Sequence, residues 1–191
     1  MLSLHFTFVA ILSSLVAASP AVDLVKRQST DNIVYVTDQN NFCMIMPRDA
    51  HTDIGDSEYP GGMQTYCSPS GHYAGNQGTL PANFWSNVAF QSGTSSRGAR
   101  YAQLTGCIRP STLDRLNPGD GGGQYDSNGG DGGQGNPQGS KCLGYNFYVE
   151  LVEPGDNRAC IKCCDNYDDC PLNLDTSGCP AVIPGNYFNC G

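Results

Sequence analysis

Short runs of alternating apolar and polar residues, separated by turn-forming residues, make up the patterned part of this chain. A period of two residues is typical of β-strands, because successive side chains point to opposite faces of a sheet. In the clearest run, NFYVELVE, the residues Phe147, Val149 and Leu151 would share one face. The pattern predicts six strands, at residues 32–37, 42–46, 63–68, 85–91, 100–108 and 146–153.

Helical periodicity is scarce in the sequence. The best candidate is residues 111–116, where Ser111 followed by Asp114 resembles the start of a helix and Pro118 closes the segment. Residues 117–140 differ in composition, because ten of these twenty-four residues are glycine. Such a segment disfavours a core, so we expect a long exposed loop there.

The ten cysteines are the strongest compositional signal. An even number of cysteines in an oxidising compartment predicts five disulfides, although their pairing does not follow from spacing alone. Six of them lie in residues 160–190, which we expect to form a coil held on the β domain by its bridges. The cysteines are Cys43, Cys67, Cys107, Cys142, Cys160, Cys163, Cys164, Cys170, Cys179 and Cys190.

These features predict a mainly β protein. The fold class is a single small disulfide-stapled domain, either a β-sandwich or barrel-like, with long loops and a cysteine-rich C-terminal coil. The 24 glycines and 12 prolines place much of the chain in turns. Each disulfide is expected to contribute on the order of 2–4 kcal/mol to stability, mainly by restricting the unfolded chain, and a domain with few core-forming residues needs that contribution.

The N-terminus predicts secretion. An apolar run from Phe6 to Val16 precedes small residues, as in a secretory signal peptide, so residues 1–18 are expected to be removed. The run is shorter than the roughly 20 apolar residues that span a bilayer. The dibasic pair Lys26-Arg27 predicts a pro-segment at residues 19–27, with an accidental basic pair as the alternative. The mature domain would be residues 28–191, secreted to the cell exterior or the cell wall.

The chain is acidic, and this excludes some partners. Its net charge is −8, and residues 28–191 hold eight basic and seventeen acidic residues, a net charge of −9. Nucleic acid and anionic membranes would repel such a chain, so we expect neither as a partner. A monomer is expected, and the partners that we consider are a cell-wall polysaccharide or a host protein.

No cofactor or metal ion is expected. Zinc bound by Cys160, Cys163 and Cys164 is an alternative to disulfides, but secreted chains favour disulfides at this spacing. The acidic segment at residues 49–58 offers the oxygen ligands that calcium prefers. Carboxylates in loops more often cap backbone amides or stay solvated, so we assign no calcium site there.

Recognisable catalytic motifs are absent, and we assign no catalytic residue. The nucleophile elbow G-x-S-x-G does not occur. A glycoside hydrolase needs two carboxylates facing each other across a cleft, and the candidates are Asp53, Asp56 and Glu58 on one side with Glu150 or Glu153 on the other. Neighbours in one turn rarely face each other across a sugar, so we expect the first three not to be a catalytic centre. Whether the protein is an enzyme stays open, with a non-catalytic protein favoured.

Aromatic residues are numerous, and flat aromatic rings can stack on sugars. At alternating strand positions they more often pack within a sheet. The segment CCDNYDDC partly matches the spacing of hevein-type chitin-binding modules, but its one aromatic, Tyr167, is too little for a sugar platform. The other rings considered are Tyr59, Tyr66, Tyr73, Trp85, Tyr101, Tyr125, Tyr145, Tyr148 and Tyr187.

The sequence resembles a group of secreted fungal cysteine-rich proteins, including those labelled macrophage-activating-glycoprotein-like. The resemblance is carried by HTDIGDSEYPGGMQTYC, RYAQLTGCI, GGQYDSNGGDGGQGNPQGS and RACIKCCDNYDDCPLNLDTSGCPAVIPGNYFNC. It covers most of residues 32–190 and implies an extracellular or cell-wall protein seen by a host. It implies no catalytic residue.

The sequence therefore favours a secreted non-catalytic protein at the cell wall or host interface, binding a polysaccharide or an external protein partner. The alternative is a small secreted polysaccharide-active hydrolase with paired carboxylates. A structural component of the cell surface without a discrete ligand is a third possibility.

Overall fold

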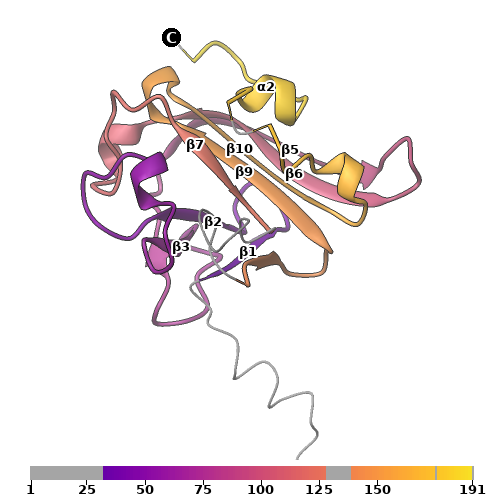
Figure 1. Cartoon of the computed structure of the whole chain (residues 1–191), viewed down its shortest axis with the longest axis horizontal. Helices are drawn as coiled ribbons and strands as arrows, with labels where there is room; N and C mark the ends of the chain where they lie inside the picture. Colours follow the sequence, from indigo (N-terminus) through magenta and orange to yellow (C-terminus); the bar gives the residue numbers. More distant parts are fainter. Residues whose placement is uncertain (1–31, 128–138, 175, 191) are drawn as a thin grey trace, which may run out of the picture.

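The alternating runs form two β-sheets in a computed structural model of the chain, which describes residues 32–127, 139–174 and 176–190 (Figure 1). The first sheet has the order β4-β3-β2-β1-β8. Its central pairs, β1 with β2 and β2 with β3, are antiparallel, whereas β8 and β4 join in parallel. Its strands are β1 (Ile33–Val36), β2 (Phe42–Pro47), β3 (Met63–Cys67), β4 (Gly78–Thr79) and β8 (Lys141–Cys142).

The second sheet is antiparallel throughout and has the order β5-β6-β10-β9-β7. The hairpin of β5 and β6 extends to one side of the molecule in Figure 1. The strands of this sheet are β5 (Trp85–Thr94), β6 (Arg100–Ile108), β7 (Gly123–Asp126), β9 (Phe147–Glu153) and β10 (Arg158–Cys164).

The main core lies between the two sheets. Tyr148 and Val152 of β9 and Ile161 of β10 pack there against Met44 and Met46 of β2, and all five are essentially buried. The sheets are not closed on each other, which makes the domain a β-sandwich rather than a barrel. The predicted mainly β, disulfide-rich class is confirmed.

A third layer covers the outer face of the second sheet. Val149 and Leu151 of β9 contact Val182 and Ile183 of the C-terminal segment, which crosses the sheet in Figure 1. The segment includes the short helices η6 (Tyr167–Asp169) and α2 (Cys179–Val182). Both faces of the second sheet are thus covered at β9 and β10.

Five disulfides join these layers, and every cysteine takes part in one. Cys142–Cys163 links the two sheets, and Cys43–Cys67 links β2 to β3. The other three fasten the C-terminal segment to β6 and β10, and they are Cys107–Cys190, Cys160–Cys179 and Cys164–Cys170. The predicted disulfides are confirmed.

The six predicted strands are all present, with their ends moved by three residues at most. The prediction that residues 117–140 form an exposed loop is wrong in the first half of the segment. Residues 123–126 form β7, which pairs with β9, and Tyr125 is completely buried there. The reason is that Gly122, at a φ of +92°, brings the chain against the backbone of Val152, where a side chain would not fit. Residues 128–138 lie outside the described part.

Two further predictions need correction. The segment at residues 111–116 does not form the predicted helix, because only the single 3₁₀ turn η3 (Pro110–Thr112) forms there. Two further 3₁₀ turns occur in other parts of the chain, η2 (Gly55–Ser57) and η5 (Pro154–Asp156). The cysteine-rich coil does not begin at residue 160, because residues 158–164 complete β10 between β6 and β9.

Two expectations concern the N-terminal part of the chain. The predicted signal peptide at residues 1–18 and the pro-segment at residues 19–27 lie outside the described residues. Within residues 32–127, 139–174 and 176–190, no helix is long and apolar enough to cross a membrane.

Candidate binding groove

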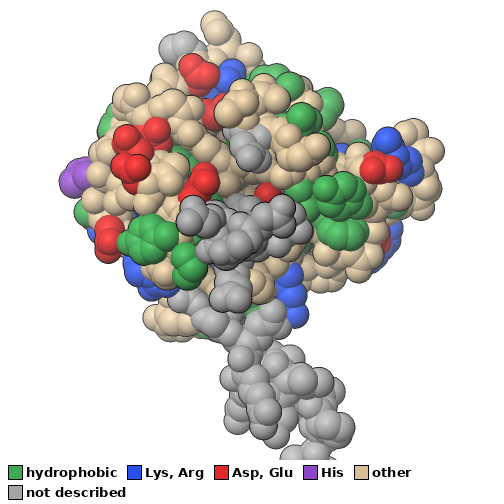
Figure 2. Space-filling view, in the orientation of Figure 1, with side chains coloured by type: hydrophobic (Ala, Val, Ile, Leu, Met, Phe, Trp, Pro, Cys, Tyr) green, Lys and Arg blue, Asp and Glu red, His purple; other side chains and the backbone are tan. Residues whose placement is uncertain are grey.

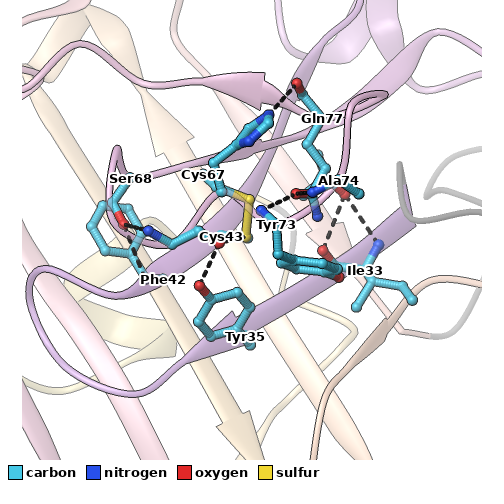
Figure 3. Close-up of a disulfide and its surroundings, with 12 residues drawn as sticks. Ile33, Tyr35, Phe42, Cys43, Cys67, Ser68, Tyr73, Ala74 and Gln77 are labelled. Carbon is cyan, nitrogen blue, oxygen red and sulfur yellow. Dashed lines mark hydrogen bonds between the residues drawn. A yellow bond between two sulfur atoms is a disulfide. The ribbon is translucent and has the colours of Figure 1, made fainter.

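The Cys43–Cys67 disulfide sits at the base of two surface loops. The two cysteines lie directly opposite each other in the register of β2 and β3, and both are fully buried. The turn at residues 37–41 leads into β2, and the loop at residues 68–74 follows β3. We call these two loops together the wall, and Figure 3 shows the contacts around its base.

The hydroxyl of Ser68 ties the two loops of the wall together. It donates to the carbonyl of Asn40 (2.6 Å) and accepts from the backbone amides of Gly71 (3.1 Å) and Phe42 (3.3 Å). Ser68 is buried, so these bonds replace water that the hydroxyl would otherwise need. The two loops therefore hold one fixed position relative to each other.

The turn of the wall is closed by Asp38. One carboxylate oxygen accepts from the amides of Asn40 (2.7 Å) and Asn41 (3.0 Å), and the other accepts from the Asn41 side chain (3.0 Å). The bond from the Asn41 side chain is the main cause of a lowered pKa of Asp38. Asp38 is therefore a structural turn residue rather than an acid–base group.

Tyr35 and Tyr73 form the aromatic flank of the wall. Tyr35 donates its hydroxyl to the carbonyl of Gly71 (2.6 Å), and the Tyr73 amide donates to the buried side chain of Gln77 (3.1 Å). Their ring centroids are 6.0 Å apart, with the rings tilted by 49°. Tyr73 is 49% exposed as a residue, so its ring can present a flat apolar surface to solvent in a position fixed by its backbone.

The opposite sides of the groove come from the second sheet and the segment after β8. Phe90 and Ser92 project from β5, and Tyr145 stands nearby. The guanidinium of Arg100 lies 5.2 Å from the centroid of the Tyr145 ring and is held by Asp165 (2.7 Å). Such cation–π contact restricts the orientation of the ring.

Between these surfaces lies an open groove with a volume of about 560 Å³. None of its lining residues is charged and none is histidine. The pKa values of Tyr35 and Tyr73 are raised, chiefly by burial, so both hydroxyls stay protonated at neutral pH. The groove is lined by Tyr35, Val36, Thr37, Tyr73, Phe90, Ser92, Ala102, Leu143 and Tyr145.

Two of the carboxylates proposed from the sequence, Glu150 and Glu153, are engaged by groups of the fold itself. Glu150 has no exposed surface and accepts from the backbone amide of Ile45 at 2.9 and 3.1 Å. Burial raises the pKa of Glu150 well above its usual value. Glu150 is therefore a core residue.

Glu153 borders a different depression, together with Asp156 and Arg158. Its two oxygens are occupied, one by the Arg158 guanidinium (2.5 Å) and the other by the amide of Cys179 (3.0 Å). A carboxylate with both oxygens engaged in this way acts as a structural anchor for the C-terminal segment.

The acidic segment at residues 49–58 is also used structurally. Asp53 accepts from the side chain of Asn117 (2.6 Å), and the amide of Ile54 donates to Asp120 (2.7 Å). Asp56 lies in the short turn η2 and is exposed. Among residues 32–127, 139–174 and 176–190, no three His, Cys, Asp or Glu side chains gather as a metal site.

Of the aromatic residues considered from the sequence, Tyr73 and Tyr145 reach the groove. Tyr125 and Tyr148 are fully buried, and Tyr59 is exposed elsewhere. Two groove residues, Tyr35 and Phe90, were not singled out by sequence reasoning. Both residues lie on predicted strands. The alternation of apolar and polar residues predicts which face of a strand is buried, but it does not show that these two side chains line a groove at the edge of the core.

Comparison with known proteins does not assign a function to this groove. No family model, no curated protein and no solved structure matches the chain.

Proposed function

We propose that this is a secreted, non-catalytic protein of the cell wall or host interface that binds a neutral polysaccharide in the aromatic groove. The observation that carries the proposal is the set of four rings, Tyr35, Tyr73, Phe90 and Tyr145, around an open groove without charged lining. The five disulfides are consistent with an extracellular protein.

The lining suits the chemistry of a pyranose ring. A sugar has an apolar face of C–H groups, which packs on an aromatic ring, and a rim of hydroxyls, which needs hydrogen-bonding partners. Thr37, Ser92 and the protonated tyrosine hydroxyls supply such partners. The volume of about 560 Å³ falls within the usual range for ligand sites, roughly 300–1,000 Å³.

The charge distribution favours a neutral ligand. The chain carries a net charge of −8, and acidic side chains are visible at several places on the face in Figure 2. Because none of the lining residues is charged, the groove itself offers no ion-pairing partner to a charged polymer, and the net negative charge of the chain disfavours an acidic one.

The rigidity of the wall supports binding without a large ordering cost. The disulfide and the bonds of Ser68 and Asp38 fix the loops before a ligand arrives. A preorganised site avoids the entropy loss of ordering loops on binding.

An external protein partner is the second candidate, and the edge strand β5 favours it. All ten residues of β5 are uncharged, none is proline, and within the described residues β5 pairs only with β6. Long uncharged edges of this kind can accept a further strand. Partner binding along β5 would be sensitive to Gln91→Lys, because a charged side chain on an edge strand opposes further pairing and Gln91 does not line the groove.

Retention of the secreted protein on insoluble chitin, cellulose and β-glucan tests the proposal. We expect retention on at least one of these polymers without release of soluble sugar. Tyr73→Ala should weaken retention about tenfold, since a lost stacking contact of this kind is worth about 1 kcal/mol or more. Tyr59→Ala is the matched control, because Tyr59 is equally exposed at 50% and does not line the groove.

Release of soluble sugar would support the hydrolase alternative instead. Absence of retention on all three polymers would refute polysaccharide binding of this class and leave the protein partner as the candidate to pursue.

A further inference from the structure

We infer that the groove continues past the wall into a second subsite, so that the ligand is an extended neutral polymer held on both flanks of the wall. This inference rests on the proposed function. The second subsite is a depression of about 580 Å³, similar in size to the groove. Residues of the same wall and of the same strand, β5, line both.

The strand β5 connects the two sites. Phe90 and Ser92 line the groove, and Val88 and Trp85 line the second subsite. Val88, Phe90 and Ser92 alternate and so share one face, and the bulge between Trp85 and Asn87 shifts the register so that Trp85 joins them. At roughly 3.3 Å per residue, Val88 and Ser92 are about 13 Å apart, longer than one sugar ring.

The wall lies beside both sites. Thr37 and Tyr73 line the groove, whereas Asn40, Ser68 and Ser70 line the second subsite. Because Ser68 bonds the two loops together, the two lined surfaces are held at a fixed separation. A polymer that binds on one flank of the wall therefore finds the second binding surface already ordered.

The chemistry of the second subsite matches that of the groove. The Trp85 ring packs edge-on against Phe42 (6.3 Å between centroids) and Phe84 (5.7 Å). The exposed side chains of Gln39 and Asn40 make no hydrogen bond within the described residues, and amides of this kind can bind sugar hydroxyls. No charged residue lines either site, which points to one neutral ligand for both.

The inference is tested by the dependence of affinity on chain length. Isothermal titration with trimers and hexamers of cello-, laminari- and chito-oligosaccharides should show hexamers of one series binding the wild type about tenfold more tightly than trimers. The double variant Gln39→Ala/Asn40→Ala should lower hexamer affinity about tenfold, as expected for two lost hydrogen bonds, and leave trimer affinity unchanged.

The control is Gln91→Ala, which removes an exposed amide of β5 that lines neither site. Equal affinity for trimers and hexamers, with Tyr73→Ala still weakening both, would overturn the second subsite and leave the proposed function in place. Loss of trimer affinity in the double variant would also overturn it, because Gln39 and Asn40 would then belong to a single site. Binding of none of these sugars would overturn the proposed function together with the inference.

Discussion

Glu150 lies in the middle of β9 with no exposed surface, and its carboxyl group meets the amide of Ile45 from the opposite sheet. It is paired in register with Tyr125, and both residues face the inter-sheet core. Burial raises its pKa well above the usual value, with the bond from Ile45 opposing that change. The folded protein thus favours the protonated form of this side chain.

A buried acid of this kind makes stability depend on pH. The folded protein binds the proton more tightly than the unfolded chain, in which the pKa of Glu is about 4.3. The contribution to stability is therefore complete below about pH 4.3 and is lost as pH rises toward the folded pKa, at up to about 1.4 kcal/mol per pH unit.

Glu150→Gln should reduce this loss, because the amide keeps an acceptor for Ile45 and cannot ionise. We expect the variant to be more stable than the wild type at neutral pH and similar to it near pH 4, as measured by urea unfolding. Asp56→Asn is the control for the loss of one carboxylate, since Asp56 is exposed, and it should leave the stability at neutral pH within about 0.5 kcal/mol of the wild type. A wild-type stability that rises with pH over this range, with Glu150→Gln lowering it, would contradict the prediction.

Glu150 also shows why the sequence alone did not predict which polar residues are buried. The alternating pattern placed Phe147, Val149 and Leu151 on one face of β9. In the structure, Val149 and Leu151 contact the C-terminal segment. The alternate face, which includes Glu150, is equally buried because the second sheet is covered on both sides. A polar residue at an alternating position usually indicates a strand face that is exposed to solvent. The structure shows that this face is buried, because the first sheet packs against it.

At the scale of elements, the wall depends on a glycine where its two loops approach each other. A Cβ atom at Gly71 would lie 2.5 Å from the Tyr35 hydroxyl, 2.7 Å from the Ser68 hydroxyl and 2.8 Å from the carbonyl of Phe42. These atoms form the hydrogen bonds that hold the wall. A side chain at Gly71 would therefore displace the wall rather than a single contact.

Gly71→Ala should destabilise the protein by about 1–3 kcal/mol, the usual range for overpacking a buried site. It should also weaken polysaccharide retention, because Tyr73 lies two residues further along the same loop. Gly75→Ala is the matched control, since no atom lies within 4 Å of a Cβ there. Thermal unfolding and retention assays measure both effects, and equal behaviour of the two variants would argue against the wall as the support of the groove.

Element prediction from the sequence succeeded where apolar residues alternate over a long run, as in β6, which begins and ends where predicted. It failed for β7, where glycine composition concealed the buried Tyr125. It also failed for β10, because its cysteines suggested a bridged coil although Ala159 and Ile161 alternate with them. The groove was not predictable, since it arises where the loops of one sheet meet the overhanging hairpin of the other.

At the scale of the whole molecule, the disulfides bind three layers into one unit. Cys163 and Cys164 are adjacent on β10, so their side chains point to opposite faces of the sheet. Cys163 reaches the first sheet through Cys142, and Cys164 reaches the C-terminal segment through Cys170. The alternation of side chains along β10 explains why these two adjacent cysteines form bridges to different layers.

Exposure predicts the order in which these bridges are reduced. Nine of the ten cysteines are at most 2% exposed, whereas Cys190 is only partly buried near the end of the chain. A reductant must reach the sulfur atoms, so the Cys107–Cys190 bridge should open first while the protein remains folded. The loop that this bridge closes spans 83 residues, but the C-terminal segment stays attached through Cys160–Cys179.

Mild reduction under native conditions, followed by alkylation and peptide mapping, should therefore label Cys107 and Cys190 before any other cysteine. Far-UV circular dichroism should remain unchanged at that stage, because neither sheet loses a strand. The other four bridges should react together and only with cooperative unfolding, since their sulfur atoms become accessible only when the layers separate. Labelling of Cys43 and Cys67 first would show instead that the wall opens in the native state, and that the groove is not the preorganised site on which its proposed function depends.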